Sequence, residues 1–232
     1  ESEFYIATTF PGVRRMVVVG DPKQLPAKVT NNACLDKGYG ESFLGHVLKM
    51  YPEKVHLLDT QYRMNPLILG FSNESYYENR VQTAAVVAKR TLVLEKPVRL
   101  VDVSGMTDEI QVGTSWKNEY DAAVIKSILM SDDAVRRLLN LLPAARVIVI
   151  SPYTAQIQFL KRELKRIEFV ASGDIATVDS FQGQEGDIVV VSPTRTSSVE
   201  FFDDNRLNVA LTRAKHLLIV VADVNYLNTP GA

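Results

Sequence analysis

The sequence predicts an α/β protein with a mostly parallel sheet. Short continuous apolar runs recur along the chain, and residues 146–150 form the clearest of them. Such runs are typical of strands that are covered by helices on both faces. From Val55 onward these runs alternate with segments of helical periodicity, an order that favours parallel pairing. Hydrophobic residues make up 46% of the 232 residues, which is enough for a large core.

Composition excludes several classes of protein. The net charge is −1, so a nucleic-acid site has to be a local groove and not a basic field. One cysteine, Cys34, and three histidines leave no disulfide framework and no zinc cluster. This usage fits an intracellular, reducing compartment, either nuclear or cytoplasmic. The longest apolar runs have the length of strands, so we expect no membrane span.

The first 60 residues carry few regular elements. We expect part of a helix over residues 4–10 and a strand over residues 16–19. Residues 28–41 are predicted to be irregular, and Ser42 to cap a helix over residues 43–50. The chain opens with acidic residues and without an initiator methionine, so we expect it to be an interior part of a longer polypeptide.

The remaining elements follow from periodicity and turn residues. Asn65 and Pro66 mark the start of a helix that runs to Tyr77. A polar stretch without a predicted element covers residues 104–116. Further helices are predicted over residues 121–130, 133–141, 155–166 and 224–227. Strands are predicted over residues 55–58, 91–94, 98–103, 146–150, 175–178, 187–192 and 216–221.

Two arginines stand out in the segment 206–215, immediately before the last predicted strand. If this segment is helical, Arg206 and Arg213 lie seven positions apart and share one face. Two guanidinium groups on one face suit an anion such as phosphate. The alternative is a surface helix with two solvated arginines.

Two turns carry polar side chains without an evident structural role. Gln24 lies between two prolines, just after the apolar run that ends at Gly20 and Asp21. Ligands of open α/β folds bind beyond such strand ends, although a plain turn capped by Asp21 is the alternative. Arg63 and Tyr62 lie at the mouth of the turn before the Asn65 helix start, where a simple capping turn is again the alternative.

Four blocks, read together, resemble the motifs of superfamily 1B helicases, the group of the nonsense-mediated-decay helicase, senataxin and the immunoglobulin-mu-binding helicase. Residues 20–26, 61–64, 177–185 and 206–215 resemble motifs III, IIIa, V and VI in that order. Ser151-Pro152-Tyr153 with Gln156 resembles motif IV, and residues 113–118 resemble the lead-in to the helix before it.

This resemblance implies a three-layer RecA-like P-loop NTPase fold with ATP in a cleft between two such domains. Residues 1–57 would be the end of the first domain and residues 58–232 the second. The sequence has no Gly-x-x-x-x-Gly-Lys-Ser/Thr loop and no Asp-Glu motif. In the family these hold the phosphates and Mg²⁺. We therefore expect the magnesium ligands to precede Glu1, and the chain alone not to hydrolyse ATP.

The resemblance also implies roles for single residues. Gln24, Arg63 and Arg213 match the catalytic positions at the γ-phosphate: a water-orienting amide and two arginine fingers. Glu185 matches the acid that binds the ribose, with Gly183 and Gly186 permitting a tight backbone. Tyr62 matches the aromatic that lies against adenine, with a half-buried core tyrosine as the alternative. Gly20 and Asp21 complete the predicted ATP site. Bracing of the motif VI segment is the alternative for Arg206.

Single-stranded RNA or DNA is the expected partner. The residues that match its contacts are Pro152, Tyr153, Thr177, Asp179 and Ser180. Short hydroxyls and backbone amides bind phosphates without reading sequence, so binding should be sequence-tolerant and salt-dependent. We expect Asp179 to fix the loop, for instance by accepting backbone hydrogen bonds, and not to touch the strand.

The resemblance therefore implies an ATP-driven helicase or translocase with 5′ to 3′ polarity. One rival is a scaffold that keeps the fold and binds nucleic acid without hydrolysis. A second rival is another P-loop ATPase, such as a nuclease-linked motor.

Overall fold

A computed structural model describes residues 9–26, 29–92, 94–106, 108–196 and 202–227. It divides the chain into two compact units, Glu1–Leu58 and Asp59–Ala232, and each is described here by itself. Within the described ranges, none of the helices combines the length and the apolar character needed to cross a bilayer.

Unit 1 is built from short helices. They are α2 (Asn32–Leu35), α3 (Phe43–Met50) and the 3-10 helix η1 (Pro52–Lys54). The predicted helix α3 is confirmed, and Ser42 caps it by accepting a hydrogen bond from Gly45 N at 2.9 Å. Helix α2 falls in a segment that we predicted to be irregular. The helix predicted over residues 4–10 lies almost wholly outside the described residues.

Two predicted strands of unit 1 are wrong. Residues 16–19 and 55–58 carry no strand assignment, and Val17 and Val19 are 86% and 79% exposed. A strand needs a neighbour for its hydrogen bonds. The described part of unit 1 contains no strand that could supply one.

Unit 2 is organised around a five-stranded sheet in the order β3-β9-β8-β6-β7. Every pairing in it is parallel, as predicted. The strands are β3 (Val98–Asp102), β6 (Val147–Ile150), β7 (Ile175–Ala176), β8 (Gly186–Val191) and β9 (Ala214–Ala222). All four residues of β6 are buried, because helices cover both faces of the sheet.

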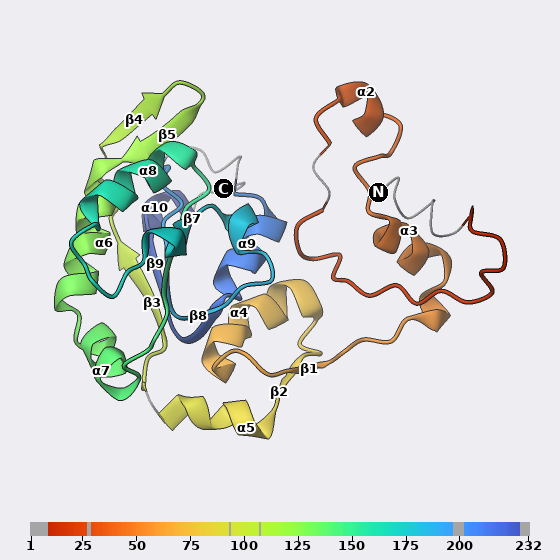
Figure 1. The fold of residues 1–232 in the computed structure, drawn as a ribbon, viewed down its shortest axis with the longest axis horizontal. Helices are drawn as coiled ribbons and strands as arrows, with labels where there is room; N and C mark the ends of the chain where they lie inside the picture. The colour runs from red at the N-terminus through yellow and green to blue at the C-terminus, as the bar shows by residue number, and fades with distance from the viewer. Residues whose placement is uncertain (1–8, 27–28, 93, 107, 197–201, 228–232) are drawn as a thin grey trace. The chain divides into compact units, whose positions relative to one another are not determined.

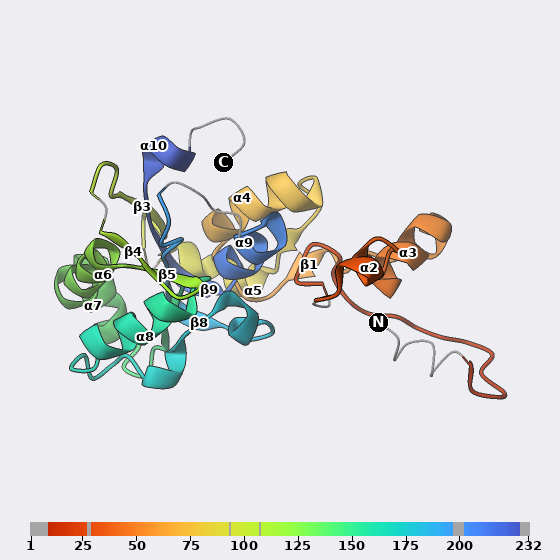
Figure 2. The same ribbon diagram turned by 90° about the horizontal axis from the view of Figure 1, so that it is seen from above.

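The sheet and the helices on its two faces form three layers. One face carries α6 (Glu119–Ser131), α7 (Asp133–Leu141) and α8 (Thr154–Glu163), and the other carries α4 (Pro66–Tyr77) and α9 (Asp204–Leu211), as both views show (Figures 1 and 2). Asn65 caps α4 by accepting from Leu67 N at 2.9 Å, which confirms the predicted start. The chain's last described helix is α10 (Val224–Leu227).

The segment between α4 and α6 differs most from prediction. It holds a short parallel pair, β1 (Thr60–Gln61) with β2 (Gln82–Thr83), then α5 (Ala85–Ala88) and the 3-10 helix η2 (Lys89–Leu92). The helix η2 occupies part of the predicted strand over residues 91–94. The polar stretch contains an antiparallel hairpin, β4 (Glu109–Val112) with β5 (Ser115–Asn118), instead of a loop.

Candidate nucleotide and single-strand sites

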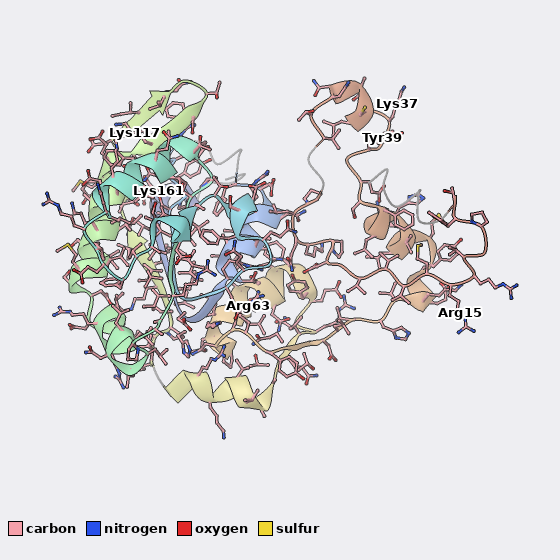
Figure 3. All side chains as sticks on the ribbon, viewed as in Figure 1. Arg15, Lys37, Tyr39, Arg63, Lys117 and Lys161 are labelled. Atoms are coloured by element: carbon pink, nitrogen blue, oxygen red, sulfur yellow. The ribbon has the colours of Figure 1, made fainter. Side chains whose placement is uncertain are left out.

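A cluster of charged side chains lies at the amino-terminal ends of β8 and β9. Glu185 directly precedes β8, and Arg213 directly precedes β9. Arg63, in the turn before α4, contacts Glu185 and the residue that precedes Arg213: its Nε donates to Glu185 Oε2 at 3.0 Å and its Nη1 to Thr212 O at 3.1 Å. Figure 3 labels Arg63 beside α4, well apart from Lys117 on the hairpin.

Glu185 has a second cationic partner that sequence reasoning did not single out. Lys215 Nζ lies 2.7 Å from Glu185 Oε1. The hydrogen bond from Lys215 lowers the pKa of the Glu185 carboxyl below its usual value, and that from Arg63 adds to it against the opposing effect of burial. Glu185 therefore stays ionised between two cations at neutral pH.

Arg213 is buried, with 1% of its surface exposed. Its Nε donates to Val209 O at 2.9 Å and its Nη1 to Gln184 O at 3.1 Å. Its Nη2 donates to Thr212 Oγ1 at 3.1 Å. Arg63 and Arg213 thus approach the same residue, Thr212, from two motifs.

The expectation that Arg206 and Arg213 share a helical face is wrong. Helix α9 ends at Leu211, where Thr212 Oγ1 donates to Asn208 O at 2.7 Å, and Arg213 lies beyond this end. Arg206 lies in the first turn and binds Asp179 Oδ2 at 3.3 Å. It also pairs with Asp203, the residue that caps α9. These contacts hold the start of α9 in place, which agrees with the alternative role given for Arg206, bracing of the motif VI segment.

Arg146 forms hydrogen bonds to the segment that carries Glu185, and the sequence analysis did not identify this residue. Its Nη1 donates to Glu185 O at 3.2 Å and its Nη2 to Gln184 Oε1 at 2.7 Å, while Asp174 anchors Nη2 at 2.6 Å. The contacts bridge 39 positions of sequence, so local pattern carries no signal of them. Only the paired register of β6 and β8 brings these residues together.

Gly183, before β8, and Gly186, its first residue, each occupy a position that favours glycine. Gly183 has a φ of +79°, a backbone conformation that favours glycine. A Cβ on Gly186 would lie 2.8 Å from the side chain of Ile148 and 3.3 Å from Arg146 O. The tight backbone predicted around Glu185 is therefore present in the structure.

The other predicted ATP-site residues are Tyr62 in unit 2 and three residues of unit 1. Tyr62 is 67% exposed, which excludes a core tyrosine and leaves its ring accessible. Gly20, Asp21 and Gln24 belong to unit 1. There Gln24 Nε2 donates to Asp21 Oδ2 at 2.9 Å, so the carboxylate holds the amide.

The predicted single-strand residues lie at the opposite ends of the strands. Pro152 and Tyr153 follow β6, but both are buried, so their side chains offer little surface to a base. Thr177 Oγ1 and Ser180 Oγ lie 3.0 Å apart after β7, and Ser180 is exposed. Asp179 accepts from the Arg206 guanidinium instead of the backbone amides that we suggested.

A buried polar network supports this edge of the sheet. Ser151, after β6, and Ser192, after β8, meet at Thr194: the Ser151 and Thr194 hydroxyls lie 2.8 Å apart. Thr194 has a φ of +73°, which is strained for a β-branched residue. Asn118 Nδ2 donates to the Thr194 carbonyl oxygen at 3.2 Å. Asp121 Oδ2 accepts a hydrogen bond from Ser192 Oγ at 2.7 Å.

Asp121 makes folding stability depend on pH. Burial raises the pKa of its carboxyl to about 7, an effect that nearby Glu109 reinforces and the Ser192 hydrogen bond opposes. Between about pH 4 and pH 7 the folded state then binds a proton that the unfolded state has released. The free energy of unfolding should therefore fall as pH rises through this window, by about 4 kcal/mol at most.

The substitution Asp121→Asn tests this dependence. Urea unfolding of the chain, followed by fluorescence of its only tryptophan, Trp116, should show a smaller loss of stability from pH 5 to pH 8 in the variant than in the wild type. An equal loss in both proteins would assign the pH dependence to other groups.

Across the described ranges, no group of three or more His, Cys, Asp or Glu side chains could hold a metal ion. The cations Arg63 and Lys215 on either side of the Glu185 carboxylate suit an anionic ligand that also carries hydroxyl groups.

Comparison with known proteins identifies the family. A family model described as an AAA domain matches residues 39–225. Helicase sen1 of Schizosaccharomyces pombe is 31% identical over 94% of this chain and 14% of its own length. An uncharacterised ATP-dependent helicase of Methanocaldococcus jannaschii is 31% identical over 92% of this chain and 33% of its own.

A third relative is the regulator of nonsense transcripts 1 homolog of Neurospora crassa. It is 29% identical over 93% of this chain and 21% of its own length. The chain thus spans a third or less of each of these relatives. The matched family domain covers most of the chain, including the blocks from motif IIIa to motif VI. The chain belongs to this AAA-domain family, within the superfamily 1 helicases of the senataxin and nonsense-mediated-decay group.

Proposed function

We propose that this chain is part of an ATP-dependent helicase or translocase that moves 5′ to 3′ along single-stranded RNA or DNA. Residues 58–232 form its second RecA-like domain, and residues 1–57 the end of the first. The observation that carries the proposal is the meeting of Arg63, Glu185 and Arg213 at one edge of the sheet, because three helicase-like blocks contribute to it.

The substrate is ATP, and each residue of the cluster has a distinct task. Arg63 and Arg213 neutralise the charge that develops on the terminal phosphoryl group. Glu185 accepts hydrogen bonds from the ribose, while the exposed ring of Tyr62 lies against adenine. Magnesium, when bound with ATP, neutralises phosphate charge.

The single strand binds at the opposite edge of the same sheet. Thr177 and Ser180 offer hydroxyls there, and Pro152 and Tyr153 contribute backbone after β6. Strand β8 runs from the Glu185 segment to the polar network at Ser192, so the two proposed sites lie at the two ends of the same strands.

ATP hydrolysis by the purified full-length protein tests the proposal. We expect single-stranded RNA, DNA or both to stimulate turnover, and the two are compared at equal salt. We also expect unwinding of duplexes with a 5′ overhang and none with a 3′ overhang. Strand binding without any hydrolysis would establish the scaffold alternative. Unwinding only from 3′ overhangs would reverse the proposed polarity.

A further inference from the structure

The Glu185 carboxylate is shared between two cations. Oε1 binds Lys215 Nζ at 2.7 Å, and Oε2 binds Arg63 Nε at 3.0 Å. The side chains of Glu185, Arg63 and Lys215 are 42%, 29% and 25% exposed. Ion pairs at this level of burial are strong enough to orient side chains, yet water still allows them to exchange.

The backbones of both cations are tied together, so only their side chains can rearrange. Asn65 N donates to Lys215 O at 2.9 Å, which joins the turn before α4 to β9. The Arg63 amide donates to Gln61 Oε1 at 2.8 Å, and its carbonyl accepts from Arg90. Neither cation can move away from Glu185 as a whole. What can vary is which of them holds the carboxylate.

Arg63 has a competing task in the proposed reaction. Its Nε is bound to Glu185 and its Nη1 to Thr212 O, so these donors are occupied by the protein itself. A bidentate contact with a terminal phosphate requires Arg63 to release Glu185. A carboxylate that bound Arg63 alone would hold it more tightly and slow that release.

We propose that Lys215 is a positioning residue that competes with Arg63 for Glu185 and so frees Arg63 to bind the terminal phosphate. The inference rests on the proposed function of Arg63. When Arg63 leaves, Lys215 keeps the partly exposed carboxylate paired. Lys215 also contributes most to the lowered pKa of Glu185, as expected of the dominant partner.

The substitution Lys215→Met in the full-length protein tests the competition. We expect kcat of strand-stimulated ATP hydrolysis to fall about tenfold, because Arg63 stays on Glu185. The KM for ATP and the affinity for the strand should change little. Lys215→Arg keeps the second cation and should retain kcat within about twofold. Lys161→Met, on α8, is the matched control for loss of one lysine (Figure 3).

The double variant with Lys215→Met and Glu185→Gln separates positioning from other roles. A neutral amide holds Arg63 weakly, so its kcat should return to that of Glu185→Gln alone. A direct phosphate contact or a purely structural role of Lys215 predicts no such recovery, and either result overturns the inference. An unchanged kcat in Lys215→Met does so too. Absence of strand-stimulated hydrolysis in the wild type would instead reject the proposed function and this inference with it.

Discussion

Replacing Arg63 with alanine in the full-length protein is expected to lower strand-stimulated ATP turnover by roughly 10³-fold or more, the range in which arginine fingers act. The fold should survive the change. Arg63 lies in a turn with 29% of its side chain exposed, and Glu185 keeps its ion pair with Lys215. Steady-state hydrolysis with saturating single strand measures the loss.

Strand affinity provides the internal control for Arg63→Ala. The residues proposed to bind the strand lie at the other edge of the sheet, so fluorescence anisotropy should report a dissociation constant close to that of the wild type. Arg80→Ala is a matched variant, because Arg80 lies just beyond the other end of α4 and pairs at the surface with Glu78. If Arg63→Ala hydrolysed ATP as fast as Arg80→Ala, Arg63 would have no catalytic role.

Arg213→Ala should combine a similar loss of turnover with a loss of stability. Arg213 is buried, and alanine would leave Val209 O, Gln184 O and Thr212 Oγ1 without its donors. A buried acceptor that loses its partner costs about 1–3 kcal/mol. Hydrolysis assays and urea unfolding, run on the same preparations, should separate this variant from Arg63→Ala, which loses turnover alone.

Arg206→Ala is the control for Arg213→Ala. Arg206 lies in the first turn of α9 and Arg213 just beyond its end, but Arg206 makes its ion pairs at the surface with Asp179 and Asp203. Such pairs contribute about 0–1 kcal/mol, so stability should change little and turnover should stay near the wild-type value. If Arg206→Ala abolished hydrolysis and Arg213→Ala did not, the finger would have been assigned to the wrong arginine.

Local chemistry predicted the parts of the fold that depend on neighbours in sequence. Asn65 and Pro66 set the start of α4, and Ser42 that of α3, because a cap acts on amides two or three positions away. The buried strands β6, β8 and β9 follow from apolar runs that suit a parallel sheet.

Prediction failed where distant contacts decide the structure. Strands β4 and β5 are four residues each and largely exposed, so the alternation of Glu109-Ile110-Gln111-Val112 is too short to mark a strand without its cross-strand partner. The end of α9 depends on the Thr212 hydroxyl and was placed too late, which put Arg206 and Arg213 on one face. The contacts of Arg146 with residues 184 and 185 require the register of the sheet, which no local signal contains.

The pairing of β3 with β9 has a consequence for synthesis of the protein. Val98 lies opposite Leu218, so β3 leaves the ribosome long before its partner is translated. Strand β9 also separates β3 from β8 in the sheet. Until it arrives, two strand edges of the nascent chain are open to pairing with other polypeptides. The sheet of this unit should therefore be completed only after β9 has been translated, and those two edges stay unpaired until then.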